Sequence, residues 1–390
     1  MKKILIASTA LVAAGMITAG SASASEKIKL NLGGYSKWWV VGAWQDDSFE
    51  AATNTGTAGQ GNANSVDVKG DNEIWFSGST KLDNGLEVGI NIELEAGGNT
   101  DSAGGGDQID KSYVYVAGGF GKVIVGTESN GTVLMHTMAP DAAGNTGADG
   151  ILTGGLAIAR PSNVTAKVTT EIDTDAEADK ITYVAPSFYG FTVGGSYVPN
   201  TAEDNQNVFN GTTTQTGSAA NEIYGVAAMY AGTIVGVGVK ASAGWVNYDV
   251  AQSTDRSNEY AFGTQLSYAG FTLGGSYRMV RENASGGVNS VANGNNASGD
   301  TWDIGLMYET GPWAVGAFYL NSTSNGVIAT QGEDEFTVYQ VSGKYNMGAG
   351  VDLLATIGHA EYDDELAKAS NADANHNEGW AVMTGLSLQF

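Results

Sequence analysis

The chain ends with Trp380-Ala-Val-Met-Thr-Gly-Leu-Ser-Leu-Gln-Phe390, which reads as one β-strand with two different faces. Successive side chains of a strand point to opposite sides. One face carries Trp380, Val382, Leu386 and Leu388, and the other carries Met383, Gly385, Ser387 and Gln389. We expect the first face to meet lipid and the second to meet a lumen. Because no charge, turn or tail follows Phe390, we expect this strand to close the fold.

The start of the chain has the layout of a secretory signal peptide. Lys2 and Lys3 precede an apolar run over residues 4–19, and small residues up to Ala24 follow. We expect residues 1–24 to be a signal peptide and residues 25–390 to be the mature protein. No later run approaches the roughly 20 apolar residues that a membrane-spanning helix needs. The sequence therefore predicts an exported chain without helical spans.

The composition excludes some classes of function. The formal net charge is −24, and loss of residues 1–24 removes two lysines and no acid, which gives −26. A negative field of this size argues against nucleic-acid binding and favours cations. The count of cysteines is 0, so disulfides and thiolate chemistry are absent, while 56 glycines point to many turns.

Alternating apolar segments recur from residue 28 to the end, and no helical period persists. We predict sixteen strands, and their ranges are 28–44, 71–82, 86–96, 110–117, 121–127, 179–186, 190–198, 222–230, 233–249, 258–268, 270–280, 300–309, 312–321, 334–346, 350–362 and 378–390.

The connections between these segments alternate between tight turns and long polar stretches. Glycine-rich turns occur at 83–85, 118–121, 187–190, 231–232, 269–270, 310–312 and 347–350. An even number of strands with short turns at one rim and long loops at the other is typical of an outer-membrane barrel. We predict an all-β fold, a 16-stranded antiparallel transmembrane β-barrel with short periplasmic turns and long external loops. A barrel of this size leaves an aqueous channel.

Individual strands show which row of side chains meets lipid. Over 86–95, Leu86, Val88, Ile90, Ile92 and Leu94 alternate with Glu87, Gly89, Asn91, Glu93 and Glu95. The two rows cannot face the same solvent. We assign the apolar row to lipid and the acidic row, including Glu87 and Glu93, to the pore wall.

The longest connection, over 128–178, is the candidate for a constriction loop. A structureless loop of about 50 residues is uncommon unless it is functional. Folded into the lumen, it would set the width and the charge of the pore. The alternative is a solvated surface loop. Its acidic residues are Glu128, Asp141, Asp149, Glu171, Asp173, Asp175 and Glu177, against Arg160 and Lys167.

Three local features resemble Gram-negative general porins of the alphaproteobacterial type. They are Gly78-Ser-Thr-Lys-Leu-Asp-Asn-Gly-Leu-Glu-Val-Gly89, the turn Ala117-Gly-Gly-Phe-Gly-Lys122, and the terminal Phe390. The resemblance implies a homotrimer, passive diffusion of small hydrophilic solutes, and a third loop that faces basic residues of the wall. It also implies that the barrel-assembly machinery recognises Phe390.

The chain departs from the general porins in its third loop and its wall. The loop lacks the Pro-Glu-Phe-Gly-Gly motif, which leaves the position of its tip open. Strand parity predicts that Lys37, Lys81, Lys240 and Arg278 point inward, and we expect Lys37 and Lys81 to face the acidic loop. The alternative is that these lysines neutralise Glu73, Glu87 or Glu93 nearby.

Other chemistry is sparse in the sequence. Asp173, Asp175, Glu177 and Asp179 could supply oxygen ligands to Ca²⁺, but the spacing lacks the glycine and closing glutamate of a calcium-binding hand. We expect no other cofactor or metal. The three histidines, His136, His359 and His376, form no metal-ligand pair in the sequence.

The sequence predicts an outer-membrane porin of a Gram-negative bacterium and no enzyme. We expect a water-filled channel for ions and small hydrophilic solutes that favours cations. The expected partners are outer-membrane lipid, two further copies of the chain and the assembly machinery, and nucleic acid is excluded. The alternatives are an outer-membrane barrel enzyme, which would need a catalytic histidine at the rim, and a secreted β-rich adhesin.

Overall fold

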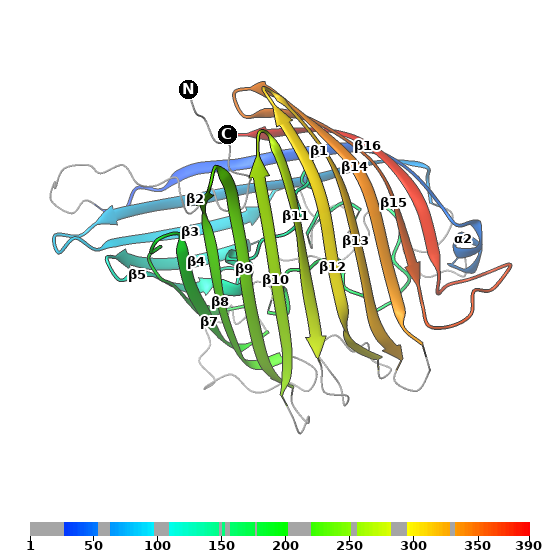
Figure 1. Ribbon diagram of the computed structural model, residues 1–390, viewed down its shortest axis with the longest axis horizontal. Coiled ribbons are helices and arrows are strands. Elements are labelled where there is room, and N and C mark those ends of the chain that lie inside the picture. The colour runs from blue at the N-terminus through cyan, green and yellow to red at the C-terminus, as the bar shows by residue number, and fades with distance from the viewer. Residues whose placement is uncertain are drawn as a thin grey trace.

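The protein is a closed barrel of sixteen antiparallel strands in the computed structural model (Figure 1). Each strand pairs with its neighbours in sequence, and β1 pairs with β16 to complete the circle. This arrangement confirms the predicted fold class. The structure describes residues 27–53, 63–96, 109–147, 150–152, 157–175, 178–201, 220–250, 256–281, 295–327 and 332–390.

The strands and two short helices follow one another in simple order along the chain. Their bounds are β1 Asn31–Gln45, α2 Asp47–Thr53, β2 Val66–Lys81, β3 Glu87–Glu95, β4 Ile109–Gly118, β5 Gly121–Thr127, α3 Gly131–Leu134, β6 Lys180–Val184, β7 Phe191–Asn200, β8 Ala220–Ile234, β9 Val237–Val250, β10 Ser257–Tyr268, β11 Phe271–Arg281, β12 Asn295–Thr310, β13 Trp313–Val327, β14 Asp334–Gly348, β15 Val351–Asp363 and β16 Asn377–Gln389.

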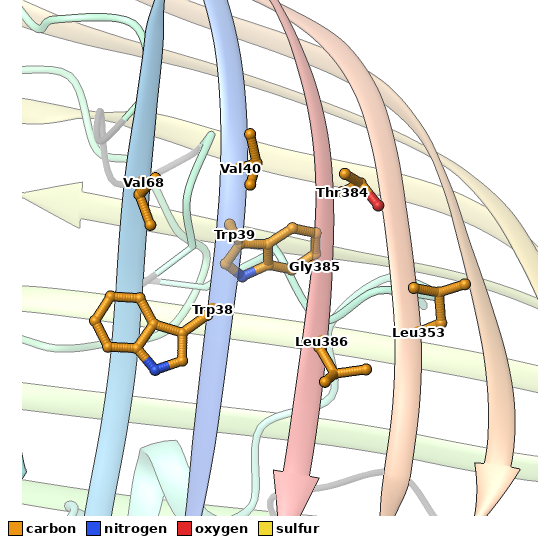
Figure 2. Close-up of a pocket in the computed structure, with 8 residues that line it drawn as sticks. All are labelled: Trp38, Trp39, Val40, Val68, Leu353, Thr384, Gly385 and Leu386. Carbon is orange, nitrogen blue, oxygen red and sulfur yellow. The ribbon is translucent and has the colours of Figure 1, made fainter.

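The last strand closes the barrel as the sequence predicted. Trp38 lies opposite Leu386 in the β1–β16 ladder, and Phe390 exchanges two backbone hydrogen bonds of 3.1 Å with Gly34. Figure 2 shows this seam, with the ring of Trp39 reaching from β1 toward Gly385 of β16. A Cβ at Gly385 would lie 2.6 Å from that ring, so the absence of a side chain there lets the two strands pair beneath the indole.

Side chains along each strand alternate between the outer surface of the barrel, which is apolar, and the inner surface. In β11, Phe271 is 51% exposed and Leu273 is 49% exposed, whereas Ser276 is 7% exposed. The outer face is apolar because it meets lipid. None of the helices in the described ranges is long and apolar enough to cross a membrane.

Tilted pairs of aromatic rings lie at two levels along the strands. Beside the tight turns, ring centroids are 4.5 Å apart for Phe271 and Tyr308 and 4.3 Å apart for Trp313 and Tyr345. Toward the long-loop rim, Trp302 and Tyr319 are 5.0 Å apart. Aromatic side chains at two levels match the interfacial girdles of an outer-membrane barrel.

One tight turn was placed wrongly from the sequence. The prediction put it at Ala231-Gly232, but β8 continues to Ile234, and the turn lies at Val235-Gly236. Both turn residues have positive φ, 49° and 83°. The error arose because Ala-Gly resembles a two-residue hairpin loop, whereas Val is a residue that such loops ordinarily avoid.

Several strands also extend beyond their predicted ranges at the long-loop rim. β2 begins at Val66 where the prediction began at 71, and β12 begins at Asn295 where the prediction began at 300. The first residues of β12 are polar or small on both faces, so no apolar alternation marks them, whereas in β2 Val66 and Val68 alternate with Asp67 and Lys69. Both extensions are stabilised by ladder hydrogen bonds with their neighbours.

Candidate functional site

The connection between β5 and β6 runs inside the barrel along its inner wall, first outward from β5 and then back to β6. On its outward course it begins at α3, where Asn130 caps the helix by accepting a hydrogen bond from Thr132 N. The backbone N–H groups that follow donate to inward side chains of successive strands. These bonds join Gly131 to Ser196 of β7, Thr137 to Ser242 of β9, Ala139 to Asp303 of β12 and Ala142 to Ser342 of β14.

The loop reaches β1 and β16 at its far end and then returns. Ala159 N donates to Gln45 Oε1 of β1, and Ala159 O accepts from Asn377 of β16. On the return course, Lys167 N donates to Ser322 Oγ of β13 and Thr170 Oγ1 donates to Asp303 Oδ2. The loop therefore lines the wall from β7 round to β1, which confirms that it folds into the lumen (Figure 1).

An apolar core fills the space between the far half of the loop and the wall. Inward side chains of β13 to β16 and β1 that would otherwise meet water are buried there. The members are Trp39, Val41, Phe318, Leu320, Phe336, Val338, Leu354, Ala360, Tyr362, Ala381 and Met383 from the wall, with Ala139, Ala143, Ile151, Leu152, Ile158, Val164 and Ala166 from the loop. Burial of apolar surface of this kind holds the loop in place.

The inner face of β2 to β5 and the first half of β1 has a different character. We call it the free wall, because the hydrogen bonds of the loop residues just described go to other strands. Its side chains are mainly charged or aromatic, and they include Tyr35, Lys37, Asp67, Lys69, Asp71, Glu73, Trp75, Ser77, Lys81, Glu87, Asn91, Glu93, Glu95, Lys111, Tyr113, Tyr115 and Lys122, with Asp110 at the edge.

Tyrosines and lysines on the free wall are bound to its carboxylates. Tyr35 Oη donates to Asp71 at 2.7 Å and to Glu73 at 2.9 Å. Lys37 Nζ lies 2.7 Å from the other oxygen of Asp71. The side chains of Lys37 and Asp71 are still 23% and 36% exposed. This part of the lumen is therefore polar, hydrated and rich in fixed charge.

A second cluster lies on β3, β4 and β5. Lys111 Nζ lies 2.9 Å from Glu93 and 3.1 Å from Asp110. Tyr115 Oη donates to Glu87 at 2.8 Å, and Lys122 Nζ lies 4.0 Å from the centre of the Tyr115 ring. Carboxylates outnumber lysines along the free wall as a whole.

The acidic residues of the loop are mostly engaged by the protein. Asp141 accepts from Ala143 N and Asn145 N of the loop and from Ser342 Oγ of β14. Glu128 accepts from Ser129 N, and Glu171 accepts from Thr169 Oγ1. Asp149 and Glu177 lie outside the described residues.

Arg278 of β11 points inward, but the loop covers it completely. Its guanidinium lies 2.6 Å from Glu259 and 2.8 Å from Asp173, and it donates to the carbonyl oxygen of Glu171. Burial would raise the pKa of Asp173, but the positive charges of Arg278 and Lys167 outweigh it and lower that pKa. Arg278 therefore ties the return course of the loop to the wall.

The other residues that the sequence predicted for the loop or the pore wall, Asp175, Lys240 and Lys81, do not lie together. Asp175 is buried 3.5 Å from Lys180 Nζ, and burial raises its pKa. Lys240 and Lys81 point inward near the tight-turn rim, where they are opposite Gln265 and Glu87 in their ladders. Since Asp173 and Asp175 each face a different cation, the structure does not bring them together around one point.

His136 joins the two courses of the loop. Its Nε2 lies 3.2 Å from Thr170 Oγ1. Burial, together with the charge of Arg278, lowers the pKa of His136 to about 4. The imidazole is therefore neutral at pH 7, as a residue inside a packed contact must be.

Sequence reasoning missed Tyr35, Asp71, Lys111 and Lys122 of the free wall. A signal for them was present, because the inward rows of β2 to β5 are charged. By contrast, inward positions of β7, β9 and β14 carry Ser196, Ser242 and Ser342, which bind the loop backbone.

A family model described as Gram-negative porin matches residues 7–365 of this sequence. The chain belongs to the Gram-negative porin family. Three solved structures with the same fold are the anion-selective porin from Comamonas acidovorans, the outer-membrane channel DcaP of Acinetobacter baumannii and the trimer form of OmpT of Vibrio cholerae.

The three structures cover nearly all of this porin at low sequence identity. The Comamonas porin matches with a TM-score of 0.60 and 15% identity, over 93% of this chain and 100% of that one. DcaP matches with a TM-score of 0.61 and 13% identity, over 93% of this chain and 97% of that one. OmpT matches with a TM-score of 0.55 and 13% identity, over 93% of this chain and 99% of that one. A comparison with curated proteins finds no match.

The porin is an outer-membrane protein that forms a water-filled channel for passive diffusion of ions and small hydrophilic solutes. Its family and fold are those of a channel. The comparisons support neither a cation preference nor the alphaproteobacterial subtype.

Proposed function

We propose that this porin favours cations and that the free wall, more than the loop, sets the preference. The observation that supports the proposal is the excess of carboxylates over lysines on the free wall, while Asp141, Asp173 and Asp175 of the loop are already bound within the protein. A lumen lined by one excess sign of charge concentrates the opposite ion.

The test is the reversal potential of single channels in a planar bilayer with a tenfold KCl gradient. We expect a sign that shows K⁺ passing more readily than Cl⁻. Replacing Glu73→Gln and Glu87→Gln together should move the potential toward zero. Both carboxylates accept hydrogen bonds from tyrosine hydroxyls, and the amide oxygen of Gln can accept the same bonds.

A matched control removes two carboxylates from the outer face of the same barrel. Glu361 and Glu378 are opposite each other on β15 and β16, on the row that also carries Trp380. The variant E361Q/E378Q should keep the wild-type reversal potential. An anion-favouring wild type, or equal shifts in the two double variants, would contradict the proposal.

We infer that the porin assembles as a homotrimer and that Phe390 is part of its assembly signal. The trimer form of OmpT, which shares the fold, supports the first inference. The two backbone hydrogen bonds between Phe390 and Gly34 support the second, because they close the barrel seam. Cross-linking of the native protein in detergent tests the oligomer, and a band no larger than a monomer would contradict it.

We propose further that diffusion through the porin involves no catalytic step. Among the described residues, His136 contacts Thr170 inside the packed loop, and on the outer face His359 stacks on Tyr339 and meets Trp380 edge-on. His376 is held by Asp373 and by the carbonyl oxygen of Asp364. Hydrolysis of ester or peptide substrates by the purified porin, lost in a variant without the three histidines, would overturn this.

A further inference from the structure

Three carboxylates from two separate segments meet at the long-loop rim of the barrel. Asp334 is the first residue of β14, and Asp364 and Glu365 follow directly after β15. One oxygen of each group lies within 4.8 Å of the others. Asp334 is 0% exposed and Asp364 is 5% exposed, so the cluster is not a set of ordinary surface acids.

The orientation of Asp334 directs one of its oxygens into the cluster. Its Oδ2 accepts from both the backbone N and the Oγ1 of Thr165 in the loop, at 2.6 Å each. Its Oδ1 is buried and has no hydrogen-bond donor among the described residues. A buried carboxylate oxygen without a donor is costly unless something positive occupies the space before it.

Two of these oxygens lie side by side against Gly326. A Cβ added to this glycine would lie 2.5 Å from Glu365 Oε2 and 2.7 Å from Asp334 Oδ1. The two oxygens are therefore packed against the backbone of β13, and any larger residue at this position would collide with both. Gly326 has a φ of +60°, so glycine suits both the backbone and the close packing.

Few cations of the described residues lie near Asp334 and Asp364. Within the described part of the chain, no lysine or arginine lies within ion-pair distance of Asp334 or Asp364. Arg160 comes near Asp334, but its guanidinium donates to the carbonyl oxygens of Val164 and Ala166. Three carboxylates held this close together need either a shared proton or a cation between them.

We propose that Asp334, Asp364 and Glu365 bind one Ca²⁺ ion at the long-loop rim. Ca²⁺ takes oxygen ligands from carboxylates, carbonyls and water in a flexible geometry, which suits three carboxylates that come from two loops. Zinc sites in proteins usually include nitrogen or sulfur ligands, and the ring of His376 is directed to the backbone oxygen of Asp364. This site is separate from the calcium site considered from the sequence at Asp173 and Asp175.

The position of the ion gives it a structural role. Through Asp334 it would be connected to Thr165 of the lumen loop, and through Asp364 and Glu365 to the connection between β15 and β16. Ca²⁺ would thus fix the far part of the loop to the rim and relieve the repulsion among the three carboxylates.

The first experiment is calorimetric titration of CaCl₂ into the full porin, purified in detergent and stripped with EDTA. We expect one saturable site per chain. The variant D364N/E365Q should bind Ca²⁺ at least tenfold more weakly. The control variant E335Q/D363N, which removes a pair of carboxylates opposite each other on β14 and β15, should keep the wild-type affinity.

The second measurement keeps the proposal testable if a variant assembles poorly. The temperature at which the barrel unfolds on a denaturing gel should rise when Ca²⁺ is added to wild-type protein, and should not rise for D364N/E365Q. In EDTA the variant should be at least as stable as wild type, because repulsion has been removed. Absence of a saturable site in wild type, equal affinity in D364N/E365Q, or equal response to Mg²⁺ would overturn the proposal.

Discussion

Arg278 shows how one residue can hold a loop inside a pore. It is fully buried and pairs with Glu259 of β10 and Asp173 of the loop. A buried charge is stable only when it is paired and hydrogen-bonded. The contact therefore joins two neighbouring strands to a loop whose Glu171 lies 107 residues away from Arg278 in sequence, and removal of the guanidinium leaves two carboxylates without their partner.

We predict that Arg278→Met lowers the free energy of unfolding by about 3–5 kcal/mol, because it breaks a buried ion pair from one side. It should also release the return course of the loop and change single-channel conductance. Urea unfolding in lipid vesicles, followed by tryptophan fluorescence, measures the first effect.

The control for Arg278 is Arg281→Met. Arg281 pairs with Asp300 at the rim, where both side chains are more than one-third exposed. Its loss should change stability by less than about 1 kcal/mol. Equal losses in the two variants would show that Arg278 is not a specific anchor.

The hairpin turn between β8 and β9 contains a residue with a strained backbone, Val235. Val235 is 98% exposed and has a φ of 49°, a conformation that β-branched residues rarely adopt. It makes no contribution to packing that would offset this cost. Asn is well suited to the same position in a two-residue turn.

We predict that Val235→Asn raises the free energy of unfolding by about 1 kcal/mol, since it removes left-handed strain from a β-branched residue. The same unfolding assay measures the change. Ala231→Asn is the control, because residue 231 lies within the extended part of β8, and no gain is expected there. A gain at 231 but not at 235 would contradict the observed turn.

Strand existence and facing could be predicted from sequence because both depend on local alternation. Phe271 and Leu273 face outward and Ser276 faces inward, as the period of two required. The turn at Val235 could not be predicted, because it uses a residue against its local preference. Tertiary pairing of β8 with β9 decides the register there.

At the scale of the whole molecule, the course of the loop was beyond local reasoning. Its backbone binds Ser242, Asp303 and Ser342, which lie 105 to 200 residues away in sequence. The loop has no period of its own that would reveal these partners. The buried ring of Trp39 on the inward row of β1 was the visible hint, since a large apolar residue in a lumen needs a cover.

The porin thus divides its interior into two parts. The inner wall from β7 round to β1 is covered by the loop, and the free wall on β1 to β5 keeps partly exposed charged side chains such as Lys37 and Asp71. We infer that solutes pass along the free wall. Ser77 of β2 lies on the free wall opposite Asn91, while Ser342 of β14 is 3% exposed and bound to Asp141.

The most direct test uses the absence of native cysteine, whose count is 0. Single channels of Ser77→Cys and of Ser342→Cys are recorded while a cationic, membrane-impermeant methanethiosulfonate reagent is added. We predict that the conductance of Ser77→Cys falls stepwise as the thiol is modified, and that Ser342→Cys keeps its conductance beneath the loop. Modification of Ser342→Cys as fast as Ser77→Cys, or no effect at Ser77→Cys, would contradict a solute path along the free wall.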